Sequence, residues 1–165
     1  MANKTSFSTE EWQQLLASPM VAAMAVTAAD PSGLFGLVKE GFAASGALAS
    51  ARSDAAANPL IKAVVAEFET SEGRTAARDY LKIQFAGQAA SVKLNAIEAL
   101  RKVSALLDAK APEDAAAFKA WLRATAQRVA EAAKEGGFLS FGGVQVSEAE
   151  KATLTEISAA LNLTA

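Results

Sequence analysis

The chain has 165 residues and a net charge of -2, from 16 basic and 18 acidic residues, and it contains no histidine or cysteine. These absences exclude disulfides, thiolate sites and imidazole chemistry, and the well-mixed charge offers no basic surface for nucleic acid. A chain of this length buries roughly 70% of the surface that its unfolded form exposes, so a single domain over residues 1–165 is expected.

The first two predicted helices lie on either side of Pro19. Residues 8–11 form a capping box, which predicts a helix over about 9–18 that ends before the proline. Residues 20–29 are apolar nearly all round and predict a second, buried helix that ends at a turn over 30–33. This apolar run is about half the length needed to cross a bilayer, and no basic segment precedes it. We therefore expect no membrane span, no signal peptide and a cytoplasmic location.

The rest of the alanine-rich chain shows apolar side chains three or four residues apart, the spacing of amphipathic helices. The remaining helices are expected at about 34–50, 58–70, 73–87, 92–107, 112–132 and 147–161. The last of them begins at a second capping box, over residues 147–150. These patterns predict an all-α, compact bundle of about seven or eight helices.

A weak internal duplication relates residues 28–40 to residues 132–150, because in both an alanine-rich helix enters a glycine-containing turn and leaves into an acidic helix. At these residues the chain resembles the TerB-like family, associated with tellurite resistance and stress. Members of that family are all-helical and carry a repeated Ala-x-Ala-Asp-Gly turn followed by a glutamate. The resemblance spans most of the chain, but Pro31 replaces the first glycine and Lys134 stands where the second aspartate is expected.

The resemblance implies a non-enzymatic domain whose acidic turns hold a divalent metal ion or dock a partner protein. Asp30 and Glu40 match the first acidic pair of the family, and Glu135 with either Glu148 or Glu150 matches the second. Oxygen ligands of this kind suit Ca²⁺ or Mg²⁺, although the first turn does not follow the EF-hand pattern. The alternative is that Asp30 caps a turn and that Glu40 lies on a solvated helix surface.

A glycine-rich segment over residues 136–143 contains three large apolar side chains, Phe138, Leu139 and Phe141. We interpret them as a partner-binding patch, and the alternative is that they fold back onto the helical core. The segment lacks the lysine of a phosphate-binding loop, so a nucleotide site is not expected.

The expected function is therefore that of a non-enzymatic TerB-like binding protein. Two other functions remain open. A small Mg²⁺-dependent hydrolase would need clustered carboxylates on facing helices. A carrier of an apolar ligand would need a cavity lined by Phe, Leu and Val side chains. The oligomeric state is left open.

Overall fold

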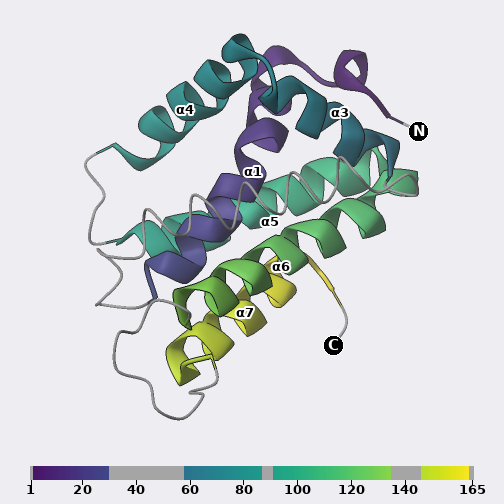
Figure 1. The fold of residues 1–165 in the computed structure, drawn as a ribbon. Helices are drawn as coiled ribbons and strands as arrows, with labels where there is room; N and C mark the ends of the chain where they lie inside the picture. The colour runs from purple at the N-terminus through teal and green to yellow at the C-terminus, as the bar shows by residue number, and fades with distance from the viewer. Residues whose placement is uncertain (1, 30–57, 87–90, 135–145, 164–165) are drawn as a thin grey trace.

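The computed structural model describes residues 2–29, 58–86, 91–134 and 146–163, and Figure 1 shows how they are arranged. Within these ranges the chain is helical and contains no strand. Its elements, in chain order, are η1 (Lys4–Ser6, a 3-10 helix), α1 (Thr9–Thr27), α3 (Pro59–Phe68), α4 (Ser71–Phe85), α5 (Val92–Lys110), α6 (Pro112–Lys134) and α7 (Glu148–Ala160).

The all-α class is confirmed, but the described ranges hold six α-helices where about seven or eight were expected. The expectation was wrong at the start of the chain, where one helix replaces two. The helix expected at 34–50 lies outside the described residues. So do residues 30–40 and 135–145, on which the proposed duplication depends, and the duplication stays a prediction.

α1 continues through Pro19, where the sequence predicted a break. A proline inside a helix has no N–H to donate to the carbonyl four residues earlier, which here belongs to Leu15. The Ser18 hydroxyl donates to that carbonyl instead, with 2.6 Å between the two oxygens. All three residues are buried, so an unpaired carbonyl would be costly there. The predicted helix end was wrong because the neighbouring serine supplies the missing donor.

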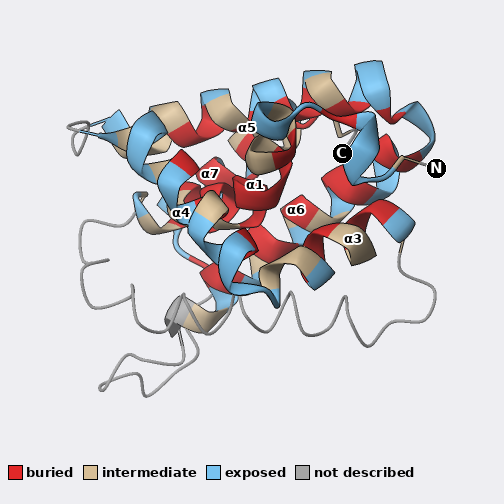
Figure 2. Ribbon diagram, turned by 90° about the horizontal axis from the view of Figure 1, so that it is seen from above, coloured by how far each residue is buried: buried red, intermediate tan, exposed pale blue. Residues whose placement is uncertain are grey.

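α1 is the central helix of the bundle and packs against each of the other five α-helices. The apolar run after Pro19 was expected in the core, and Val21, Ala22, Ala25 and Val26 are indeed buried. Figure 2 shows the buried residues of the surrounding helices turned toward the interior. The largest fully buried side chains come from five helices and from the C-cap residue of α7: Leu15, Leu16, Val21 and Val26 of α1, Leu60 and Val64 of α3, Leu100 and Leu107 of α5, Phe118 and Leu122 of α6, Ile157 of α7, and the cap residue Leu161.

A break between α3 and α4 was expected near residues 70–73, and it lies at residues 69–70. Thr70 caps α4, because its hydroxyl oxygen accepts a hydrogen bond from the Gly73 N–H at 2.9 Å. A β-carbon at Gly73 would overlap the carbonyl group of Glu67, so this close approach of backbones needs glycine. Arg74 donates to the carbonyls of Phe68 and Glu69, which lie at the end of α3. Local hydrogen bonds thus explain the sharp turn.

The first turn of α6 is held by a buried carboxylate, that of Asp114, which is 1% exposed. One of its oxygens accepts from the Ala2 N–H at 2.7 Å, and the other accepts from the Asn58 side-chain amide at 2.8 Å. Asn58 is itself the N-cap of α3. One carboxylate therefore joins the N-terminal segment, the start of α3 and the start of α6. A negative charge is also favourable at a helix N-terminus.

Further along α6, Lys119 is 5% exposed and joins α6 to α5. Its ammonium group donates to both carboxylate oxygens of Asp108, at 2.6 and 2.7 Å. Asp108 remains half exposed to water. A buried charge needs such a partner, because removing an ion from water is unfavourable unless hydrogen bonds replace the lost hydration.

α7 begins at the predicted capping box. The Ser147 hydroxyl accepts from the Glu150 N–H, and the Glu150 carboxylate accepts from the Ser147 N–H at 2.8 Å. The helix then packs against α1, α5 and α6. Among the described helices, none combines the length and the apolar character that crossing a membrane requires.

Candidate functional site

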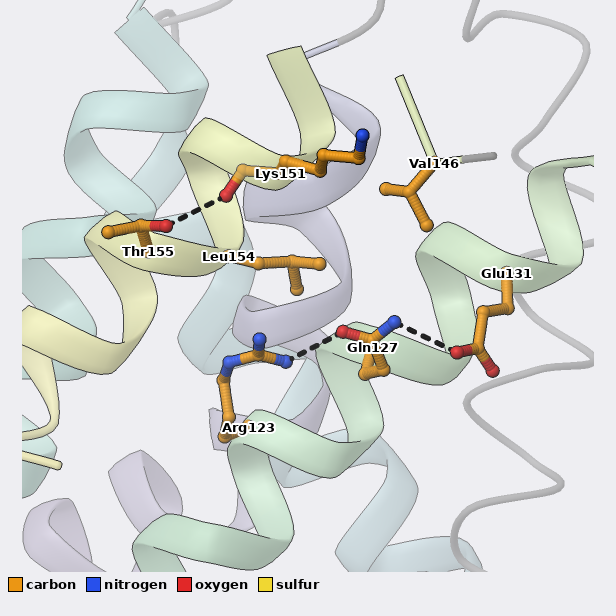
Figure 3. Close-up of a pocket in the computed structure, with 7 residues that line it drawn as sticks. All are labelled: Arg123, Gln127, Glu131, Val146, Lys151, Leu154 and Thr155. Atoms are coloured by element: carbon orange, nitrogen blue, oxygen red, sulfur yellow. Dashed lines mark hydrogen bonds between the residues drawn. The ribbon is translucent and has the colours of Figure 1, made fainter. Parts of the chain in front are cut away.

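A solvent-open pocket of about 460 Å³ lies between α6 and α7 (Figure 3). Arg123, Gln127 and Glu131 line it from α6, four residues apart, so they lie along one face of that helix. Lys151, Leu154 and Thr155 line it from α7, and Val146 lies just before the start of that helix. The pocket thus combines charged, polar and apolar side chains from two helices.

On the α6 side of the pocket, hydrogen bonds link three side chains in a row along the helix. The Arg123 guanidinium donates from Nη1 to the side-chain oxygen Oε1 of Gln127 at 3.0 Å, and Nε2 of the same Gln127 side chain donates to a Glu131 carboxylate oxygen at 2.8 Å. Figure 3 shows this row along α6. The Arg123 Nε donates across to the Ser158 hydroxyl of α7 at 2.9 Å. The guanidinium is therefore fixed in position by partners on both helices.

Arg123 differs from the other charged residues of the described lining because it is partly buried. Partial burial lowers the pKa of its guanidinium, because burial removes water from the charged form. Arginine nevertheless keeps its charge in proteins. Its partners in the described part of the chain are the neutral oxygens of Gln127 and Ser158, and no carboxylate pairs with it there. Among the described residues, the positive charge thus has no counter-ion.

Lys151 supplies a second positive charge, from the α7 side. Its ammonium group donates to Glu148 at 2.7 Å, but the Glu148 side chain is 90% exposed. A pair so open to water is worth little and restrains Lys151 weakly. The described residues that line the pocket carry two positive charges and the negative charge of Glu131, and Glu148 pairs with one of the positive charges, that of Lys151. Arg123 is thus the cation of the described lining that has no carboxylate partner.

The sequence-predicted site residues fall mostly outside the described residues. This holds for the metal candidates Asp30, Glu40 and Glu135, and for the partner-binding candidates Phe138, Leu139 and Phe141, which stay predictions.

Glu148 and Glu150, the two alternatives at the second acidic turn, are both described. Glu148 pairs with Lys151 in the first turn of α7, and Glu150 is buried in the capping box. Both carboxylates thus interact with groups in the first turns of their own helix. Within the described ranges no group of three or more acidic residues is placed to hold a metal ion.

The pocket residues were not singled out from the sequence. Their spacing of four residues on α6 is also that of an ordinary solvated helix surface, so it carried no distinctive signal. The charged residues of α6 and α7 meet only because the two helices pack against each other. The chain matches no protein-family model, no curated protein sequence and no solved structure. The TerB-like assignment accordingly stays a prediction.

Proposed function

We propose that this chain is a non-enzymatic binding domain and that the pocket between α6 and α7 is its binding site. The observation that carries the proposal is the half-buried Arg123 guanidinium, which borders an open pocket and has only neutral partners among the described residues. Partial burial of a charge costs free energy that packing alone does not return. A bound ligand or partner would supply the missing counter-charge.

The chemical groups of the pocket favour binding over catalysis. Arginine does not act as a general base because it stays protonated. Glu131 is the carboxylate in the described lining, and it is exposed and bonded to Gln127. The hydrolase alternative needs clustered carboxylates around Mg²⁺. For this reason we expect no hydrolysis of p-nitrophenyl phosphate with Mg²⁺ present.

The carrier alternative needs a lining of a different kind. Five of the seven described side chains that line this pocket are polar or charged, and two are aliphatic. An apolar carrier site is instead lined predominantly by hydrophobic and aromatic groups. A stress-related role, of the type that the TerB-like resemblance implies, is part of the proposal and is compatible with a binding domain.

The proposal is tested by screening small fragments of neutral, positive and negative charge against the ¹⁵N-labelled chain. We expect fragments that bind to shift the amide signals of residues 123–131 and 151–155 more than others. Thr155→Trp places an indole into the pocket and should abolish these shifts. Thr75→Trp, on an exposed position of α4, is the matched control and should leave them unchanged. The proposal fails if no fragment class binds at these helices, or if Thr155→Trp binds fragments as the wild type does.

A further inference from the structure

We propose that the ligand of the α6–α7 pocket carries one carboxylate on a small apolar body. This inference rests on the proposed function, since it names the chemistry of what the pocket binds. Arg123 lines the pocket from α6 and Lys151 from α7, and Val146 and Leu154 form the apolar part of the described lining.

The hydrogen-bond donors of Arg123 suit an oxyanion. A guanidinium has five N–H groups. Two of them are used, by Ser158 and Gln127, and the other three have no acceptor in the described part of the chain. These three belong to the two Nη atoms, whose parallel N–H groups match the two oxygens of a carboxylate. The bond from Nε to Ser158 holds the group in place before a ligand arrives.

The charge of the pocket favours one negative charge over two. Lys151 already pairs with Glu148, whereas Arg123 has only neutral partners among the described residues. One carboxylate balances the charge of Arg123. A phosphate monoester carries about two negative charges at neutral pH, and its second charge would be repelled by Glu131.

The volume of the pocket indicates a ligand that is larger than a single small ion. Its volume of about 460 Å³ lies within the range of roughly 300–1,000 Å³ that small-molecule sites occupy. A carboxylate group alone would leave most of this space to water. Val146 and Leu154 are 9% and 4% exposed, so their small open surfaces offer contact to an aliphatic or aromatic body. Such a group could come from a free carboxylic acid or from an acidic side chain of a peptide.

The first experiment compares four ligands of similar size by NMR titration of the full chain: benzoate, benzamide, phenyl phosphate and benzylamine. We expect benzoate to bind saturably at residues 123–131 and 151–155, with benzamide about tenfold weaker because it lacks the charge that pairs with Arg123. Phenyl phosphate should be weaker than benzoate. Equal binding of benzamide and benzoate, or tighter binding of phenyl phosphate, overturns the inference.

The second experiment changes one charge at a time and measures the benzoate dissociation constant. Arg123→Gln should weaken binding about tenfold or more, and Lys151→Gln about threefold. Glu131→Gln should tighten binding about twofold, because it removes the repulsive charge. Lys102→Gln, on an exposed position of α5, is the matched control for Lys151→Gln and should have no effect.

Lys151 and Glu131 are exposed, so their variants keep the test valid even if Arg123→Gln folds poorly. Weaker benzoate binding by Glu131→Gln contradicts the inference.

A third arm separates the two sources of the carboxylate. A blocked peptide with one glutamate between leucines is compared with its glutamine counterpart and with benzoate. Tighter binding of the glutamate peptide than of benzoate indicates a protein partner, and the reverse indicates a free acid. Binding of neutral or positive fragments at the pocket, with no binding of either carboxylate, overturns this inference and leaves the proposed function standing. No binding by any fragment overturns both.

Discussion

The charged side chains in the two halves of α6 differ in how deeply they are buried and in the partners that they contact. In the first half, Asp114 and Lys119 are almost fully buried, and each is bonded to a partner from another part of the chain. In the second half, Arg123 is only partly buried, and its partners are neutral. Lys119 and Arg123 are four residues apart, about one helical turn. Within one turn, the helix changes from joining elements to lining an open pocket.

This difference separates stabilising charges from charges that can bind. Removing the partner of a buried ion leaves an unsatisfied charge in the interior, so breaking such a contact destabilises the native fold. A partly exposed ion with neutral partners contributes less to stability and remains able to pair with a ligand. Variants that leave a buried group at α6 unpaired should therefore lose more stability than variants of Arg123.

The largest effect is expected for Asp114→Ala. It removes the acceptor for both the Ala2 N–H and the Asn58 amide. We expect the free energy of unfolding to fall by about 3 kcal/mol and the Tm to fall by roughly 6–12 °C, measured by urea and thermal unfolding with circular dichroism. Asp79→Ala, at an exposed position of α4, should change stability by less than about 0.5 kcal/mol. A loss below about 1 kcal/mol for Asp114→Ala would contradict the stabilising role of this carboxylate.

Smaller losses of stability are expected at the Lys119–Asp108 pair, and the variant that removes the carboxylate should lose more than the variant that removes the ammonium group. Asp108→Ala leaves the buried ammonium without its partner and should destabilise by about 2–3 kcal/mol. Lys119→Met replaces the buried charge by an apolar side chain of similar length and should destabilise by less than about 1 kcal/mol. Thermal unfolding of the two variants checks the order. If Lys119→Met is the more harmful change, the charge pair itself stabilises the fold.

Arg123→Met should change stability by about 1 kcal/mol or less, because it removes hydrogen bonds to two neutral oxygens only. Arg101→Met, on an exposed position of α5, is the control for losing an arginine at the surface. Both are measured by urea unfolding. A loss as large as that of Asp114→Ala would place Arg123 with the stabilising charges and erase the contrast between the two halves of α6.

The smallest effect is expected beyond the end of α6, for the double change Phe138→Ser with Phe141→Ser. As partner-binding residues they should alter the free energy of unfolding by less than about 0.5 kcal/mol. If these side chains instead pack on the core, the loss should be a few kcal/mol. Phe118→Ser, at a fully buried position of α6, gives the scale of a core loss in the same unfolding assay.

Much of the helical structure could be predicted because its signals are local. The capping boxes at Ser8 and Ser147 mark the starts of α1 and α7, and the apolar stripes of α5 and α6 supply core side chains such as Leu100 and Phe118. The helix end predicted at Pro19 was wrong, because helix propensity counts only the N–H that proline lacks. In the structure the preceding Ser18 hydroxyl donates the missing hydrogen bond.

The pocket could not be predicted in the same way. Arg123 and Lys151 look like ordinary surface residues in the sequence, where the acidic turns and the aromatic segment are more distinctive. The Glu148 carboxylate pairs with Lys151, three residues further along its own helix. The interpretation of Asp30, Glu40 and Glu135 as metal ligands, like that of the aromatic segment, remains to be tested.

The amino-acid sequence by itself determined that this protein is all-α and where most of its described helices begin. Caps, periodicity and helix propensity act over a few neighbouring residues, and each can be read without knowing the fold. Only the tertiary structure decided which charges are buried and which remain open. Ala2 meets Asp114, and Arg123 meets Ser158, across 112 and 35 residues of chain. Such contacts depend on how whole helices pack, and packing sets the burial that distinguishes a stabilising charge from one able to bind.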